Sequence, residues 1–270
     1  MTTDDNKLDE LVSAVMQGSR YQKLSPDLIR RIARQEMSRR KSLKEAVRTT
    51  RGKLHQTAGA YLGKKIPYEE MNNELQSLPY DLSDPQAHSF CKQTMQYHAS
   101  TRERLPILHD FFKEALEPIA PVTSILDLGC GFTPLCLPWM PVCEDIQYYA
   151  CDIYSDMIDF INSYFHHFQL NGKTGLCDLG SSIPEQSAQL GLLLKMIPCL
   201  EQTDKLISKQ LLKNINTDHI LISYPVRSLG GKAKGMRQHY SQHFKSLIAD
   251  TNWRSVEFEF ETEIAFLISK

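Results

Sequence analysis

The feature that most constrains the fold is a series of short apolar segments in the second half of the chain. Five of them alternate with helical patterns and lie at residues 124–129, 146–152, 174–179, 190–196 and 219–226. Strands that alternate with helices form parallel sheets. Two more strand patterns, at 255–260 and 263–268, are separated by only two residues. They must form an antiparallel hairpin, because a parallel crossover needs about a dozen residues or more. The sequence therefore predicts an α/β fold with a seven-stranded sheet that ends in a hairpin.

The first hundred residues have a helical pattern instead. The stretch SPDLIRRIARQEMSRR places Ser25 at the N-cap and Pro26 at the first helical position. A further helix is expected over residues 42–61, and prolines then separate shorter helices. We therefore predict two domains, a helical N-terminal domain over 1–104 and a sheet domain over 105–270.

The first strand of the predicted sheet ends in a glycine turn. It reads SILDLGCG, so that Gly129 and Gly131 follow an acid at the end of a buried strand. Such a turn brings a ligand against backbone N–H groups. The third glycine of the dinucleotide fingerprint is missing, which argues against a pyrophosphate and for a ligand without phosphate.

Acids also end the next two strands. Asp152 lies 21 residues after Gly131, where a carboxylate holds ribose hydroxyls, and Asp178 is placed to accept from an adenine amino group. Three such acids in order, with the terminal hairpin, resemble a class I S-adenosylmethionine (AdoMet) methyltransferase. We therefore expect AdoMet as the cofactor.

Charge is divided unevenly along the chain. The formal net charge is −1, yet residues 20–65 carry 14 Lys/Arg against three acids. Clustered cations bind polyanions by neutralising phosphates, so this region favours a nucleic-acid partner over a solvated helical surface without function.

Other classes of protein are disfavoured by what the sequence lacks. No stretch approaches the roughly 20 apolar residues of a membrane span, and the acidic start does not match a secretory signal. The seven cysteines are odd in number and form no C-x-x-C pair, which indicates reduced thiols and a cytoplasmic protein. The nine histidines show no ligand spacing, so no metal site is expected.

Several motifs together resemble one enzyme family. They are KLHQTAGAY (53–61), HASTRERL (98–105), LDLGCGFTPL (126–135), LLLKMIPCLE (192–201) and ISYPVRSLGGKAKGM (222–236). In this order they resemble the aminoglycoside-resistance 16S ribosomal RNA methyltransferases. Those enzymes methylate N7 of guanine 1405 in the decoding site of the 30S subunit, so the resemblance implies that activity, that partner and the resistance it confers.

The resemblance also implies a set of cofactor contacts. His98, Ala99 and Ser100 would lie over AdoMet, and Arg104 would pair with the methionine carboxylate. The remaining contacts would be Gly129 at the cofactor, Asp152 at the ribose, Asp178 and Leu179 at the adenine, and Leu194 and Gln202 along the wall. Departures from the family pattern at Thr133, Arg237 and Glu261 touch none of these positions and suggest a divergent member.

The expected chemistry needs no catalytic side chain. N7 of neutral guanine carries an unshared electron pair, so no proton has to leave before it attacks a methyl group. The target base has to leave its helix to reach the cofactor. Residues 219–249 contain five Lys/Arg and no acid, and they include a glycine-containing loop after the fifth strand.

We expect RNA contacts in two places. In the loop, phosphates would bind Arg227, Lys232, Lys234 and Arg237, and Met236 or Tyr240 would pack against the flipped base. The basic N-terminal region would add a broader surface that recognises shape, with Arg30, Arg31, Arg34 and Lys53. We expect a monomer that acts on the assembled subunit.

Two alternatives stay open at this point. Pro198–Cys199 resembles the pair that supplies the nucleophile in pyrimidine C5 methyltransferases, so an rRNA cytosine-C5 methyltransferase is the second hypothesis. The competing interpretation of Cys199 is a buried small apolar residue. A third, least favoured hypothesis is an RNA-binding module with a vestigial cofactor site.

Overall fold

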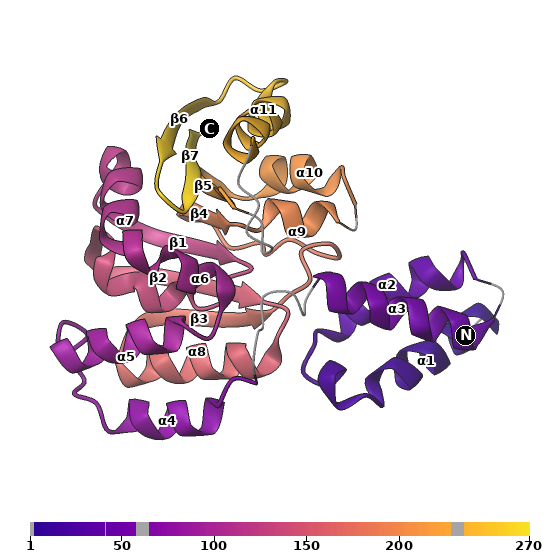
Figure 1. The fold of residues 1–270 in the computed structure, drawn as a ribbon. Helices are drawn as coiled ribbons and strands as arrows, with labels where there is room; N and C mark the ends of the chain where they lie inside the picture. Colours follow the sequence, from indigo (N-terminus) through magenta and orange to yellow (C-terminus); the bar gives the residue numbers. More distant parts are fainter. Residues whose placement is uncertain (1–2, 41, 58–64, 203, 228–234) are drawn as a thin grey trace.

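The sheet of the protein has seven strands, as predicted. A computed structural model describes residues 3–40, 42–57, 65–202, 204–227 and 235–270. The strands are β1 (Val122–Leu128), β2 (Val142–Asp152), β3 (Asn171–Leu176), β4 (Ala188–Leu194), β5 (Thr217–Pro225), β6 (Arg254–Glu259) and β7 (Glu263–Ser269). Their order across the sheet is β3-β2-β1-β4-β5-β7-β6 (Figure 1).

The pairing directions confirm the class I methyltransferase fold. The strands β1 to β5 are mutually parallel, and β7 pairs antiparallel with both β5 and β6. The last strand of the chain therefore lies inside the sheet, between its predecessor and β5. Two strands differ clearly from their predicted bounds: β2 begins at Val142, four residues earlier than predicted, and β3 ends at Leu176, which leaves Asp178 in the following turn.

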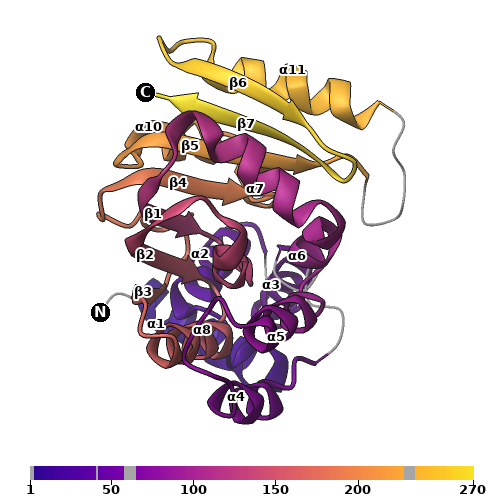
Figure 2. The ribbon, with the colours of Figure 1, turned by 90° about the vertical axis from the view of Figure 1, so that its left-hand side faces the viewer.

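Helices cover the two faces of the sheet. One face packs on α7 (Leu108–Leu116), α8 (Ser155–His167) and the 3₁₀ helix η4 (Thr133–Trp139), together with α4 (Tyr68–Gln76) and α5 (Pro85–Met95). The other packs on α9 (Ile197–Glu201), α10 (Ile207–Asn214) and α11 (Met236–Ile248) (Figure 2). The short 3₁₀ segments η1 (Ser19–Tyr21), η2 (Leu105–Ile107) and η3 (Glu117–Ile119) complete the elements with α6 (Ala99–Arg104).

Three N-terminal helices form a unit with a core of their own. They are α1 (Thr3–Met16), α2 (Pro26–Met37) and α3 (Leu43–Thr57), and they stand apart from the sheet in Figure 1. Ser25 is the N-cap of α2 and Pro26 its first residue, as predicted. The helix expected over 42–61 is described as far as Thr57, and residues 58–61 lie outside the described ranges. We call residues 3–57 the helical unit.

The packing bears on the domain boundary predicted at residue 104. Helices α4 and α5 contribute Met71, Leu75, Phe90 and Met95 to the same hydrophobic core as the sheet, whereas the core of the helical unit is built from α1 to α3. The packing therefore favours a boundary between α3 and α4, and the division at 104 stays a prediction. None of the helices in the described ranges is long and apolar enough to cross a membrane.

Candidate functional site

A cavity lies at the carboxyl ends of the parallel strands, where ligands bind in open α/β sheets. Its volume is about 80 Å³, and it continues into open solvent. The predicted residues in its wall are His98, Ser100, Gly129, Asp152, Asp178, Leu179 and Leu194. Sequence reasoning missed other wall residues, namely Thr57, Cys130, Ile153, Tyr154, Cys177, Lys195, Met196 and Leu200.

The glycine turn after β1 forms one wall of this cavity. Gly129 and Gly131 have φ angles of +72° and +51°, which side chains disfavour. A Cβ on Gly129 would lie 2.5 Å from Met196 Sδ, and one on Gly131 would lie 2.8 Å from His98 Cε1. Only glycine therefore fits at these two positions, where the turn packs against Met196 and His98 of the cavity wall.

Asp152 lies beside that turn at the end of β2. Its carboxylate accepts hydrogen bonds from the backbone N–H groups of Gly131, at 2.9 Å, and Ile153, at 2.7 Å. Burial raises the pKa of Asp152 and these hydrogen bonds oppose the rise. The turn and the acid are thus held together, with the carboxylate in the cavity wall, which fits a contact to ribose hydroxyls.

His98 precedes α6 and lies against the glycine turn and the ring of Phe132. Burial, with the charges of Arg104, Lys195 and Arg102, lowers the pKa of His98 to about 4. The imidazole is therefore uncharged at neutral pH. Ala99, its predicted neighbour at the cofactor, is buried but is not in the cavity wall.

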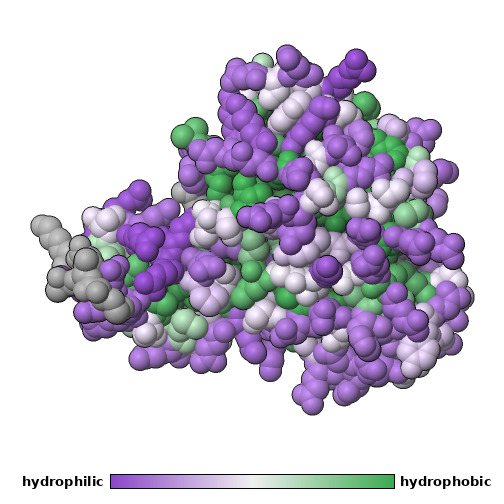
Figure 3. Space-filling view, turned by 180° about the vertical axis from the view of Figure 1, so that it is seen from behind, coloured by the Kyte–Doolittle hydropathy of each residue, from purple (hydrophilic) through white to green (hydrophobic). Residues whose placement is uncertain are grey.

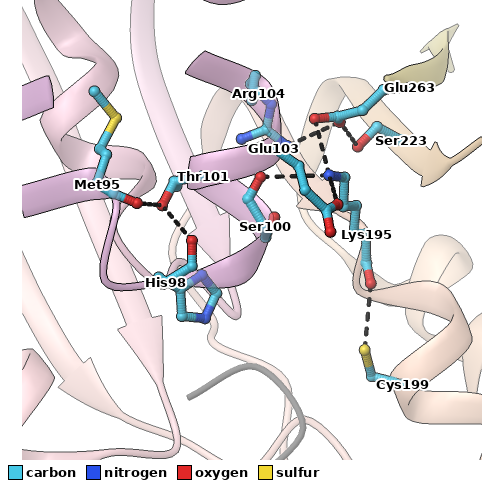
Figure 4. A network of polar contacts seen from close by, with 10 residues as sticks. All are labelled: Met95, His98, Ser100, Thr101, Glu103, Arg104, Lys195, Cys199, Ser223 and Glu263. Carbon is cyan, nitrogen blue, oxygen red and sulfur yellow. Dashed lines mark hydrogen bonds and ion pairs between the residues drawn. The ribbon is translucent and has the colours of Figure 1, made fainter. Parts of the chain in front are cut away.

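Arg104 belongs to a buried ionic network behind the cavity (Figure 4). Its Nη2 donates to Glu263 Oε2 at 2.9 Å, and both side chains are fully buried. The charge of Glu263 holds the pKa of Arg104 above its usual value, although burial acts in the opposite direction. Nε and Nη1 of Arg104 have no hydrogen-bond partner among the described residues. These buried donors fit a further anion, such as the predicted methionine carboxylate.

Lys195 joins this network to the cavity. Its Nζ lies 2.7 Å from Glu103 Oε2, 3.3 Å from Glu263 Oε1 and 3.3 Å from the carbonyl oxygen of Ser100. Ser223 Oγ also donates to Glu263, at 2.7 Å. Sequence reasoning missed Lys195 and Glu263, although each is a charge within an apolar strand pattern, which is costly unless the charge is paired.

Asp178 and Cys199 complete the polar wall. The carboxylate of Asp178 pairs with Arg31 of α2 at 2.6 Å, so a residue of the helical unit reaches the cavity. Cys199 Sγ donates to the carbonyl oxygen of Lys195. The predicted wall residue Gln202 instead caps α9 and is exposed outside the cavity.

The predicted RNA-contact residues lie in varied surroundings. Arg34 and Arg227 are exposed, whereas other predicted cations are paired with acids, namely Arg30 with Asp9, Lys53 with Glu36 and Arg237 with Glu259. Met236 begins α11, and Tyr240 stacks on Tyr224 with centroids 4.7 Å apart. Lys232 and Lys234 lie outside the described residues.

Hydrophilic side chains cover the helical unit and also much of the rest of the face drawn in Figure 3, where apolar side chains gather in the upper middle. Within the described ranges, no group of three or more His, Cys, Asp or Glu side chains is arranged to hold a metal ion.

Comparisons with known proteins agree with this geometry. The family model described as ribosomal RNA methyltransferase (FmrO) matches residues 17–267. The 16S rRNA (guanine(1405)-N(7))-methyltransferase of Micromonospora rosea is 31% identical, covering 100% of this chain and 99% of its own. The protein of the same name from Serratia marcescens is 30% identical over 97% of this chain and 98% of its own. The crystal structure of 16S rRNA methyltransferase RmtF in complex with S-adenosyl-L-homocysteine superposes with a TM-score of 0.83, at 26% identity, covering 100% of this chain and 99% of that one.

Proposed function

This chain belongs to the FmrO family of ribosomal RNA methyltransferases, and from that premise we propose that it methylates N7 of guanine 1405 in 16S rRNA with AdoMet as methyl donor. The single observation that carries the cofactor assignment is that the glycine turn, Asp152 and Asp178 line one cavity at the carboxyl edge of the sheet. The full-length similarity to the relatives carries the assignment of the nucleotide.

The chain's own residues would hold the cofactor along this wall. Asp152 would bind the ribose hydroxyls, and Asp178 and Leu179 would meet the adenine. Arg104 is buried behind this wall, and its unpartnered Nη1 would have to become accessible to bind the carboxylate. AdoMet, when bound, supplies an electrophilic methyl group. The protein then has to exclude water and place N7 of the flipped base in line with that group.

No side chain has to remove a proton in this reaction. N7 carries its electron pair in the neutral base, and His98 is uncharged at neutral pH because its pKa is lowered to about 4. Catalysis is therefore positioning. The substrate is the assembled 30S subunit, which implies a cytoplasmic enzyme, and we propose that it acts as a monomer and confers aminoglycoside resistance.

The helical unit would supply the wider contact with rRNA. Its basic residues include the exposed Arg34, while the exposed Arg227 follows β5 at the cavity edge of the sheet. Arg30, Lys53 and Arg237 would have to exchange their acidic partners for phosphates.

A second candidate is an rRNA cytosine-C5 methyltransferase. It is supported by one observation, which is that Cys199 lines the cavity. In that chemistry the thiolate adds to C6 of the base, so removal of the sulfur abolishes turnover. In the N7 reaction the thiol has no role.

Transfer of labelled methyl from AdoMet to purified 30S subunits tests both candidates. Borohydride–aniline treatment cuts RNA at N7-methylguanine, so we expect one cut in the decoding helix, produced equally by the wild type and by Cys199→Ala. Label without a cut, lost in Cys199→Ala, would replace the proposal with the C5 reaction. Asp152→Asn is the cofactor-site control and should abolish labelling.

A further inference from the structure

The helical unit makes a direct ionic contact with the cavity. Arg31, on α2, donates from Nε to Asp178 Oδ2 at 2.6 Å and from Nη2 to Oδ1 at 2.9 Å. This bidentate geometry is the strong form of an arginine–carboxylate pair. Arg31 was expected to bind RNA, but in this structure its guanidinium faces an acid of the cofactor wall.

Gly180 makes this approach possible. A Cβ at this position would lie 2.4 Å from Arg31 Cζ and 2.6 Å from its Nε. The guanidinium therefore lies directly over the turn that follows Asp178, and any side chain at residue 180 would displace it.

The carboxylate of Asp178 accepts several hydrogen bonds. Besides the two bonds from Arg31, it accepts from Ser181 Oγ at 2.7 Å and from the backbone N–H of Gly180 at 3.2 Å. A carboxylate has about four acceptor positions, so these bonds fill it and fix its orientation. Burial would raise the pKa of Asp178, but the bonds and the charge of Arg31 hold it below the usual value.

Other contacts of the helical unit lie at the same end of the cavity. Ser25 N donates to the Ile153 carbonyl oxygen at 2.7 Å, and Ser155 N donates to that of Lys23 at 2.8 Å. Leu24 and Tyr154 form an antiparallel β-bridge there, and Thr57 of α3 lies in the cavity wall. The unit thus touches the chain just after Asp152 and Asp178.

We propose that Arg31 is a positioning residue for the cofactor, which aims the Asp178 carboxylate at the adenine amino group and couples cofactor binding to docking of the helical unit. The inference rests on the proposed function, because it takes Asp178 as the adenine acceptor. Because all four acceptor positions are occupied in this structure, the amino group would replace the longest bond, which Gly180 N donates to Oδ1. Since coupling is reciprocal, a docked helical unit favours the cofactor and the cofactor favours a docked unit.

Calorimetric titration with two ligands tests the positioning. S-adenosylhomocysteine offers a 6-amino donor, whereas S-inosylhomocysteine has a carbonyl oxygen there, which the carboxylate repels. We expect the wild type to prefer the adenosyl ligand by about 10- to 100-fold, which is the contribution of one hydrogen bond to a charged group. In Arg31→Ala the dissociation constant of the adenosyl ligand should rise about tenfold or more, as is typical when a group that orients a binding residue is removed, and the preference should fall.

Three further variants separate positioning from folding. Arg31→Lys keeps the positive charge but loses the bidentate guanidinium. Gly180→Ala keeps both charges but displaces the guanidinium of Arg31. Both variants should also lower the preference for the adenosyl ligand. Arg51→Ala is the matched control, because Arg51 binds the carbonyl oxygens of Ala14 and Val15 within the helical unit. It should leave both affinities unchanged.

Hydrogen exchange supplies the second readout. The adenosyl ligand should protect amides of α2 in the wild type and in Arg51→Ala, but not in Arg31→Ala. An unchanged preference in Arg31→Ala and Gly180→Ala, whether or not both affinities drop together, would overturn the inference. If the wild type bound neither ligand, the proposed function itself, on which this inference rests, would be refuted.

Discussion

Replacement of Glu263 by Gln should be one of the most destabilising single changes in this protein. The carboxylate is fully buried and lies 2.9 Å from Arg104 Nη2 and 3.3 Å from Lys195 Nζ. An amide of the same shape leaves Arg104 without its ion-pair partner, whereas Lys195 keeps Glu103 at 2.7 Å. Removing one member of a buried pair costs about 3–5 kcal/mol, a large part of the roughly 5–15 kcal/mol of a typical domain.

Urea unfolding, followed by tryptophan fluorescence and circular dichroism, measures this loss. The matched control is Glu259→Gln in the same hairpin, because Glu259 pairs with Arg237 at 3.1 Å while the two side chains are 64% and 39% exposed. Exposed pairs contribute about 0–1 kcal/mol, so the control should unfold close to the wild type. A loss below about 1 kcal/mol in Glu263→Gln, with an unchanged urea slope, would refute the buried-charge argument.

The same variant has a predictable pH dependence. Burial opposes ionisation of Glu263, but Arg104 and Lys195 outweigh it and hold its pKa below the usual value of 4.5. The unfolded chain therefore takes up the proton first as the pH falls, and the wild type loses this stabilisation below about pH 4.5. The difference in unfolding free energy between wild type and variant should be constant near neutral pH and should become smaller in acid.

Three other changes have defined outcomes. Gly131→Ala should abolish binding of S-adenosylhomocysteine in calorimetry, because φ is +51° and the new Cβ meets His98 at 2.8 Å. His98→Gln should flatten the fall in unfolding free energy between about pH 6.5 and 4, since the folded pKa of about 4 makes the unfolded chain bind the proton first; an identical pH profile would contradict this. Arg227→Ala should weaken 30S binding and reduce the slope of log affinity against log salt by about one phosphate contact, whereas unchanged salt dependence would exclude Arg227 from the interface.

The strands could be predicted because their signal is local. β4, β5 and β7 carry continuous apolar runs, β6 alternates apolar and acidic residues, and the two-residue gap before Glu263 allows only a hairpin. The edge of the sheet that binds the ligand could be predicted from the acids and glycines at the strand ends, since parallel strands place their carboxyl ends together. Helical spacing likewise placed Ser25 and Pro26 at the start of α2.

The ion pairs could not be predicted in the same way. Arg31 and Asp178 are 147 residues apart in the sequence. Helical periodicity places Arg31 off the apolar face of its helix, but it does not show which residue the side chain contacts. Arg104 was expected to bind only the cofactor, yet its nearest anion is Glu263 on the last strand. Such partners depend on how whole elements pack, which no local pattern encodes.

The position of β7 inside the sheet has a consequence for the order of folding. The contact between Arg104 and Glu263 closes a separation of 159 residues, and contacts over such distances form slowly. Until β7 pairs with β5, the guanidinium of Arg104 lacks its ion-pair partner Glu263 and resists dehydration. We therefore expect α6 to dock and β7 to pair with β5 together and late in folding, which would complete the network behind the cofactor cavity.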